Sequence, residues 1–163
     1  MQYRFASTVD VAIINRWLAE AHLPHDDLNS HLRHFIVASE GEVIVGIIGL
    51  EVHDHIGLLR SLVVAPDLRK QGIGRDLVEK LCEHAIAQGV RDLYLLTVDA
   101  QGYFSRLGFG RIERSLAPQP IRATRQFSAL CPSSATLMYR SLARDDMSTT
   151  PCTDMNQSLP PSK

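Results

Sequence analysis

LVVAPDLRKQGIGRDLV, residues 62–78, passes from an apolar run through a proline and two glycines into an amphipathic segment. The apolar residues before Pro66 show little alternation, which is typical of a strand covered on both faces, and a proline rarely continues such a strand. We therefore predict a central strand over 56–66. Beyond the loop, apolar residues recur at helical spacing, which predicts a helix from Gly72 to Gln88 that ends at Gly89.

The two glycines of this loop have two interpretations. Gly72 and Gly74 lack a Cβ, so main-chain amides can approach a ligand closely, and a helix N-terminus attracts phosphate. Three basic residues bracket the turn and match a pyrophosphate in charge: Arg69, Lys70 and Arg75. The alternative is a tight connection that binds nothing. A dinucleotide fingerprint and a P-loop do not fit, because Leu77 replaces the third glycine and no Gly-Lys-Ser/Thr follows.

The rest of the chain predicts helices and strands in a definite order. Apolar spacing after Asp10 predicts a first helix that ends before Pro24, and the polar run at 25–35 predicts a short second helix. Two β-rich runs then flank a turn at 39–42, which indicates a hairpin. Further along we expect a second parallel strand at 91–98, a short helix closed by Gly108, a strand near 109–114, a proline-flanked insertion at 118–132 and a last strand at 135–142.

Composition limits the class of protein. The chain has 163 residues and 45% hydrophobic content, which suits one domain, and we place it at residues 1–142 with a disordered polar tail at 143–163. Its net charge of -1 excludes the broad basic surface of most nucleic-acid binders. Three scattered cysteines do not form a disulfide framework or a zinc motif, and no apolar run is long enough for a membrane span. We therefore expect a soluble, cytoplasmic protein that binds no metal, nucleic acid or membrane.

The loop and its surroundings resemble the acetyl-CoA motif of the GNAT superfamily of N-acetyltransferases. The shared features are the buried strand, the proline and Arg-x-x-Gly-x-Gly at the start of a helix. The predicted order of elements is also similar, from Tyr3 to Leu142. LLRSLVVAP, LYLLTVDAQGYFSRLGF and IRATRQFSALCPSSA look like the branch named arsenic-resistance N-acetyltransferases.

The resemblance implies a fold and a cosubstrate. The fold would be α/β (α+β), a mixed and mostly antiparallel twisted sheet with splayed parallel strands 4 and 5, flanked by about four helices. The pantetheine arm of acetyl-CoA would pair with the main chain of the first splayed strand, here Leu62, Val63 and Val64. The resemblance assigns the pyrophosphate to the loop residues Arg69, Lys70, Gln71, Gly72, Ile73, Gly74 and Arg75.

The sequence departs from the family pattern at the catalytic positions. The tyrosine that many relatives use as general acid corresponds to Phe104, which becomes a candidate cofactor contact, and Tyr103 stands one position earlier. Thr97 replaces the asparagine that often follows the second parallel strand, so we expect it to contact the pantetheine. No glutamate stands on the central strand, and the nearest acidic alternative as base is Glu51, whose simpler interpretation is an exposed charge at a strand end.

Arginines are the candidates for binding an acceptor. Arg60, with its neighbour Ser61, lies next to the expected cleft, and Arg122 and Arg125 lie in the insertion, so together they would clamp an acid group. For the insertion pair, solvated loop charges are an equal alternative.

Three other side chains have a possible metal or metalloid chemistry. His53 and His55 share a strand face by alternation, but without a third ligand we interpret them as surface residues. Cys131 could meet a soft metalloid or be a small buried residue.

These observations predict an acetyl-CoA-dependent N-acetyltransferase. The acetyl group would pass directly, in a ternary complex, to the amine of a small acceptor, with an amino-acid-like compound as one candidate. The branch resemblance implies an arsenical or phosphinate toxin. The alternatives are a non-catalytic acyl-CoA sensor and, more weakly, a metalloid-binding protein. A homodimer is expected from the resemblance.

Overall fold

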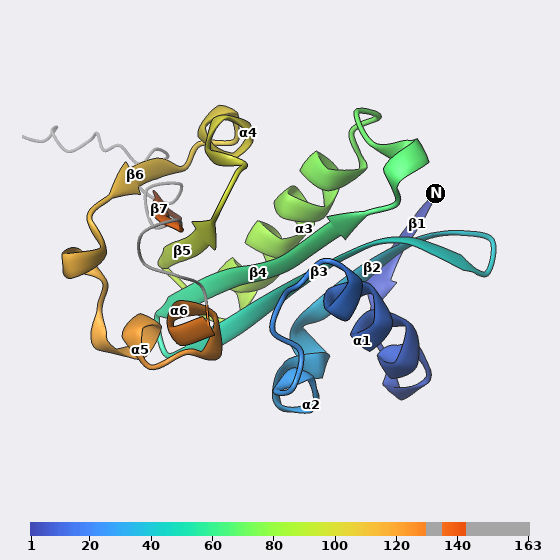
Figure 1. The fold of residues 1–163 in the computed structure, drawn as a ribbon, viewed down its shortest axis with the longest axis horizontal. Helices are drawn as coiled ribbons and strands as arrows, with labels where there is room; N and C mark the ends of the chain where they lie inside the picture. Colours follow the sequence, from blue (N-terminus) through green and yellow to red (C-terminus); the bar gives the residue numbers. More distant parts are fainter. Residues whose placement is uncertain (130–134, 143–163) are drawn as a thin grey trace, which may run out of the picture.

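The computed structural model describes residues 1–129 and 135–142 of the chain. One mixed sheet runs through it, in the strand order β1-β2-β3-β4-β5-β7-β6 (Figure 1). The strands are β1 (Gln2–Phe5), β2 (Phe35–Glu40), β3 (Val43–His53), β4 (Ile56–Val64), β5 (Asp92–Thr97), β6 (Gly110–Ile112) and β7 (Thr136–Ser141). The α-helices are α1 (Val11–Glu20), α2 (Leu28–His31), α3 (Ile73–Ala87), α4 (Gln101–Arg106), α5 (Gln119–Arg122) and α6 (Arg125–Ala129).

The sheet topology confirms the predicted fold class. β4 lies in the middle of the strand order, and β4 and β5 are parallel, whereas the other neighbouring strands are antiparallel. The connection from β4 to β5 passes through α3, as a parallel pair requires. The hairpin of β2 and β3 turns at Gly41, whose φ of 62° suits a residue without a Cβ.

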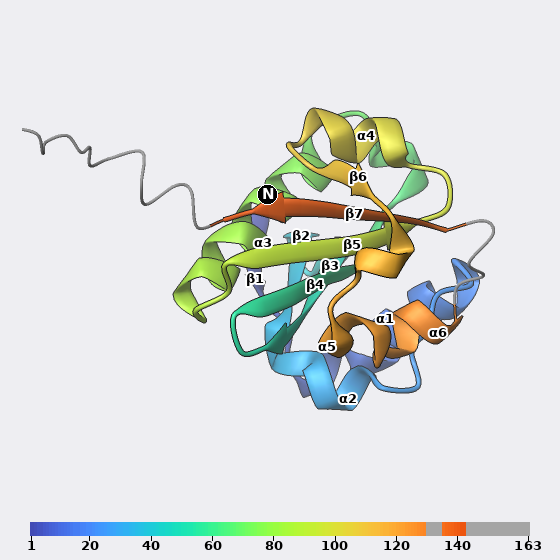
Figure 2. The same cartoon turned by 90° about the vertical axis from the view of Figure 1, so that its left-hand side faces the viewer.

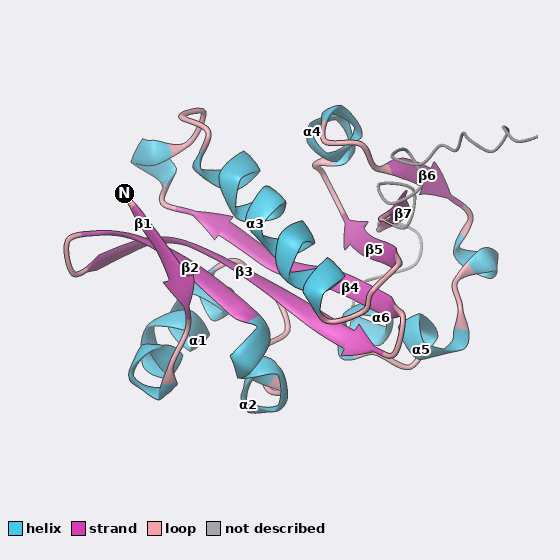
Figure 3. Cartoon of the chain, turned by 180° about the vertical axis from the view of Figure 1, so that it is seen from behind, coloured by secondary structure: helices cyan, strands magenta, loops and turns pink. Residues whose placement is uncertain are grey.

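Each face of the sheet is covered by its own helices. On one face lie α3 and α4 (Figure 3). Their side chains Leu77 and Phe104 belong to the same core cluster as Leu59 of β4. On the opposite face α1 and α2 pack through Ile14 and Leu28 (Figure 2). This is why β4 has buried side chains on both faces and shows little alternation in the sequence.

The helices confirm most of the predicted boundaries. α3 begins after Gly72 and ends before Gln88, and α4 is followed by Gly108, whose φ is 95°. The four expected helices correspond to α1 to α4. The insertion, which carried no predicted structure, adds α5 and α6.

Three parts of the chain differ from the predictions or lie beyond them. β1 was missed, because it is a short strand whose mostly exposed residues produce no apolar alternation. The tail at 143–163, predicted to be disordered, and residues 130–134 lie outside the described residues. None of the helices in the described part has the length and apolarity needed to cross a bilayer.

Candidate functional site

The parallel strands separate at a bulge in β4. β4 pairs with β5 only as far as Leu59 and Leu95. On its other side the register against β3 shifts, so that Ser61 and Leu62 together lie opposite one residue. Ser61 has a φ of 65°, in the left-handed region, and such an extra residue bends a strand. Beyond Leu59 the main chain of β4 therefore has no strand partner on the β5 side in the described structure.

The cores that the β4 side chains join identify Ser61 as the additional residue of the bulge. Leu59 faces the α3 side of the sheet, and so do Leu62 and Val64. Val63 faces the α1 side. Without the bulge, strict alternation would have placed Val63 on the same side as Leu59. The bulge thus sets the orientation of Leu62, Val63 and Val64 along the unpaired edge.

The loop before α3 presents main-chain amides. Gly72 is the N-cap of α3, with a φ of 89°, and its carbonyl accepts a hydrogen bond from the amide of Asp76 at 3.0 Å. No side chain caps this end of the helix among the described residues. Lys70 also has a positive φ, 68°. The first amides of α3 are therefore available to an anion.

The side chains of this loop have different environments. Arg69 donates from Nε to the carbonyl of Val64 at 3.1 Å, which ties the loop to the end of β4. Lys70, Gln71 and Arg75 are exposed. Ile73, by contrast, is buried in the core, so only its main chain can contact a ligand.

Tyr103 lies where β4, α3 and α4 meet. A Cβ placed on Gly74 would be 2.5 Å from Tyr103 Oη and 3.8 Å from Val64 Cγ2, so the tyrosine hydroxyl lies against the first turn of α3. Burial raises the pKa of Tyr103, although the charges of Arg75 and Arg106 act in the opposite direction. The hydroxyl is therefore protonated at neutral pH and is a hydrogen-bond donor.

Phe104 and Thr97 position α4. Phe104 is buried, with its ring edge-to-face against Tyr103 and Phe109, at centroid distances of 5.3 and 5.8 Å. Thr97 Oγ1 accepts a hydrogen bond from the amide of Ala100 at 3.1 Å, which closes the turn between β5 and α4. Their predicted contacts with a cofactor stay predictions.

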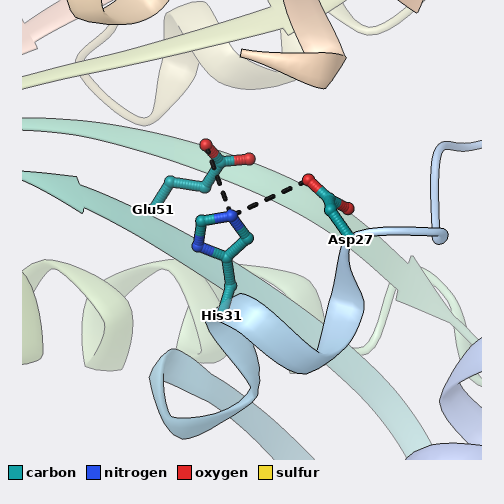
Figure 4. Close-up of side chains that lie close together, drawn as sticks. All are labelled: Asp27, His31 and Glu51. Carbon is teal, nitrogen blue, oxygen red and sulfur yellow. Dashed lines mark ion pairs between the residues drawn. The ribbon is translucent and has the colours of Figure 1, made fainter.

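A buried charge cluster lies on the opposite face of the sheet, between β3 and α2, and Figure 4 shows three of its members, Asp27, His31 and Glu51. Here it is called the Arg60 cluster, and its members are Asp27, His31, Glu51, His53 and Arg60. Arg60 Nη1 donates to Asp27 Oδ2 at 2.8 Å and to Glu51 Oε2 at 2.9 Å. Its Nη2 donates to the carbonyl of Pro24, and its Nε donates to Ser61 Oγ. Each guanidinium nitrogen is thus engaged.

This cluster corrects two predictions. Glu51 is not an exposed charge at a strand end, because it is only 2% exposed and bonded to Arg60. His53 Nε2 lies 3.2 Å from Glu51 Oε1, whereas His55 lies in the turn after β3, so the two histidines do not share a strand face. The predicted alternation ran two residues past the end of β3 at His53.

The insertion arginines have partners as well. Arg122 donates to the carbonyls of Ala117 and Ser115, which fixes the chain before α5. Arg125 forms an ion pair with Asp26, which joins α6 to the segment before α2. Cys131 lies outside the described residues.

The sequence reasoning missed Asp27 and His31. Their spacing of four residues on a short helix was the only local signal, and their Oδ2 and Nε2 atoms are 3.7 Å apart. Together with Glu51 they also form a possible metal-ligand group whose atoms lie within 4.8 Å of one another.

Comparisons with known proteins agree with this geometry. Residues 7–109 match the model of the Acetyltransferase (GNAT) family. An uncharacterized N-acetyltransferase of Chlorobaculum tepidum is 33% identical over 97 residues, which cover 59% of this chain and 62% of that protein. The match therefore spans less than two thirds of this curated relative.

Solved structures share the fold at low identity. N-acetylglutamate synthase from Neisseria gonorrhoeae, in complex with coenzyme A and L-arginine, superposes with a TM-score of 0.74 at 19% identity, over 86% of this chain and 32% of that one. A Mycobacterium tuberculosis protein in complex with CoA has a TM-score of 0.71 at 22% identity, over 86% of this chain and 99% of that one.

Proposed function

Because this chain belongs to the acetyltransferase (GNAT) family, we propose that it transfers an acetyl group from acetyl-CoA to the amine of a small acceptor, directly within a ternary complex. The observation that carries the proposal is the unpaired edge of β4 beside an uncapped helix N-terminus. An extended chain with amide groups can pair with such an edge, and a pyrophosphate suits the amides of the loop. That both structural neighbours are described as CoA complexes supports this choice of cosubstrate.

The residues of the chain fit coenzyme A at both ends of the site. Gly72 has a left-handed φ, which favours glycine, and a Cβ on Gly74 would lie 2.5 Å from Tyr103 Oη, so glycine at both positions keeps the loop open without displacing the tyrosine. The side chains of Lys70 and Arg75 are exposed beside the loop and match a pyrophosphate in charge. When bound, the cosubstrate supplies an acetyl thioester.

Within this proposal three groups of the chain have assigned roles. The main chain of Leu62, Val63 and Val64 binds and orients the arm of the cosubstrate. The amides of 71–75 hold its phosphates. Tyr103 holds a proton at Oη at neutral pH, since the ordinary pKa of tyrosine is 10.0 and burial raises it further, and we assign it the role of general acid.

The test is turnover with a panel of amines. The protein is incubated with acetyl-CoA and with amino acids, polyamines, aminoglycosides and arsenical analogues, while release of free thiol is followed. Thiol that appears only with an amine supports the proposal. Binding of CoA without amine-dependent thiol across the panel would instead favour a non-catalytic acyl-CoA sensor.

The panel also tests the finer hypothesis about the acceptor. An amino-acid-like toxin with an arsenical or phosphinate group carries an acid group, which arginines would bind. Preferential turnover of such analogues would support it, and the arsenic-resistance resemblance stays a prediction until then.

A further inference from the structure

A cavity of about 380 Å³ lies between β1 and the C-terminal half of α3, and here it is called the β1–α3 cavity. Its volume is within the range of small-molecule sites. β1 is at one edge of the sheet, on the side of α3 away from α4 (Figure 3). Two lining residues, Lys80 and His84, follow Gly74 at about 9 and about 15 Å along the helix axis. The cavity is therefore separate from the glycine loop at the N-terminus of α3.

Part of the cavity wall is apolar. Phe5, Ile36 and Ala87 contribute this part. Ile36 belongs to the core on the α3 face, whereas the side chain of Phe5 is 53% exposed. A ligand side chain that packed on the ring of Phe5 would remove this surface from water. The wall therefore favours a ligand with an apolar or aromatic side chain.

Two opposite charges on α3 line the same cavity. Lys80 Nζ lies 5.3 Å from the centroid of the Tyr3 ring, and Glu83 is exposed one turn further along the helix. Residues three apart on a helix are neighbours on its surface. Within the described part of the chain, neither side chain forms an ion pair or a hydrogen bond. The cavity thus offers one unpaired ammonium group and one unpaired carboxylate.

His84 adds a hydrogen-bond donor to the cavity. Arg33 Nε donates to His34 Nε2, so the proton of His34 is on Nδ1 and is donated to His84 Nε2 at 2.9 Å. Burial lowers the pKa of His84, so its ring is neutral at pH 7 and holds its own proton on Nδ1. No described residue accepts a hydrogen bond from this Nδ1. That N–H group is therefore left for a ligand.

The other polar side chains of the cavity wall are already engaged. Arg4 donates from both Nη atoms to the carboxylate of Asp10, at 2.9 and 3.1 Å. Tyr3 donates its hydroxyl to Asp76 Oδ2 at 2.9 Å. Burial, together with this hydrogen bond, raises the pKa of Tyr3 to about 12, so the hydroxyl keeps its proton at neutral pH. Neither side chain therefore adds a free charge to the cavity.

This set of groups favours a zwitterion. A simple anion would be attracted by Lys80 but repelled by Glu83, and the reverse holds for a simple cation. An α-amino acid carries both charges, on groups attached to one carbon atom. Its carboxylate would bind Lys80 and the N–H of His84, and its ammonium group would bind Glu83. Its side chain would then pack on the apolar wall beside Phe5.

We propose that the β1–α3 cavity binds a free α-amino acid with an apolar or aromatic side chain. This site goes beyond the proposed function, because it lies apart from the residues assigned to the acetyl transfer. The amino acid and coenzyme A should therefore bind to the protein at the same time.

The test is a binding titration of the full chain without acetyl-CoA. Free phenylalanine is added while the imidazole resonances of His34 and His84 are followed by NMR. Three probes each lack one feature: phenylpropionate has no ammonium group, phenylethylamine has no carboxylate, and glycine has no apolar side chain. We expect phenylalanine to shift these resonances and to bind about threefold tighter than either single-charge probe. Its advantage over glycine should be about tenfold.

Substitutions on α3 identify the groups that bind each charge. Lys80→Gln should remove the advantage of phenylalanine over phenylethylamine, and Glu83→Gln should remove its advantage over phenylpropionate. Two matched controls should retain phenylalanine binding: Lys80→Arg keeps the charge, and Glu79→Gln changes an exposed carboxylate of α3 that does not line the cavity. All of these positions are exposed, so the fold should be kept.

Several results would overturn the proposed amino-acid site. They are the absence of a shift with phenylalanine, equal binding of phenylalanine and the single-charge probes, unchanged binding in both the Lys80→Gln and Glu83→Gln variants, and displacement of phenylalanine by coenzyme A. If a variant does not fold, the comparison of the four probes in the unmodified protein still decides. No acetyl transfer is measured, so the outcome does not depend on the proposed function.

Discussion

At the scale of single residues, the Tyr103 hydroxyl occupies the position that a Cβ on Gly74 would need. A Cβ on Gly74 would approach Tyr103 Oη to 2.5 Å, but the next tyrosine atom, Cζ, only to 3.5 Å. The collision therefore comes from the hydroxyl group alone. The far end of a tyrosine can move at low cost to the fold, so the effect should appear in ligand binding more than in stability.

We predict that Gly74→Ala weakens CoA binding about tenfold while the melting temperature changes little. The displaced hydroxyl would then lie in the proposed cosubstrate site. In a Tyr103→Phe background the same alanine should be tolerated, because the remaining contact is an ordinary one. Calorimetric titration with CoA checks both, with Gly110→Ala as control, where a Cβ has no neighbour within 4 Å. Equal losses in both backgrounds would contradict the steric explanation.

Tyr103→Phe itself should lower kcat roughly 100-fold, with a much smaller change in the KM for acetyl-CoA. The reason is that the substitution removes a proton donor and keeps the ring that packs on Phe104. Steady-state thiol release measures both constants. The matched control is Tyr3→Phe, because Tyr3 donates its hydroxyl to Asp76. An unchanged kcat in Tyr103→Phe would show that solvent supplies the proton.

At the scale of elements, the bulge of β4 determines where the site lies. Ser61 is 5% exposed and is held at a φ of 65°, and its hydroxyl accepts a hydrogen bond from Arg60. Ser61 therefore connects the part of β4 that is not paired with β5 to the Arg60 cluster on the opposite face of the sheet. A β-branched residue is strained at this φ, whereas glycine is not.

We predict that Ser61→Val lowers the free energy of unfolding by about 1–3 kcal/mol. Ser61→Gly loses only the hydrogen bond to Arg60 and gains backbone freedom, so its effect should stay within about 1 kcal/mol. Urea denaturation of the two variants beside the unmodified protein measures the difference. Equal stability of the valine and glycine variants would show that the bulge is not strained.

At the scale of the whole molecule, a histidine pair connects α3 to the start of β2. His34 Nδ1 and His84 Nε2 are 2.9 Å apart, and Arg33 Nε donates to His34 Nε2. His34 therefore carries its proton on Nδ1 and donates it to His84. Burial lowers the pKa of both rings, and the charges of His84, Arg33 and His31 lower that of His34 further.

This pair predicts that stability falls as the pH is lowered. Both rings are neutral in the folded protein, whereas the unfolded chain binds protons below the ordinary value of 6.5. The contribution is complete above that value and is lost as the pH falls towards the lower folded pKa. Urea denaturation between about pH 7.5 and about pH 5.5 measures the loss, because most carboxylates stay ionised there. His84→Gln should flatten the slope, and an unchanged slope would contradict the assignment.

The oligomeric state is a second prediction at the scale of the whole molecule. The resemblance implies a homodimer, and size-exclusion chromatography with light scattering would test it. A mass of about 18 kDa would exclude it under those conditions, since one chain has a mass of 18.1 kDa.

Local patterns were sufficient to predict most of the fold. The apolar run of β4, the glycines that flank α3 and the order of elements all depend on neighbours in the sequence, and the structure confirms them. The loop at 69–75 could likewise be singled out, because glycine chemistry and a helix N-terminus are local features. β1 could not, because its stability comes from pairing with β2.

What the sequence by itself determined is the strand, loop and helix around Gly72 and Gly74, the proposed cosubstrate site. Only the tertiary structure decided the partners of the charged residues. Arg60 was expected beside the cleft as a clamp, but it pairs with Asp27, 33 residues away, and with a glutamate on the neighbouring strand. Such pairs form where packing brings distant segments within hydrogen-bond distance and excludes water. The sequence around a charged residue therefore does not predict which carboxylate will pair with which guanidinium.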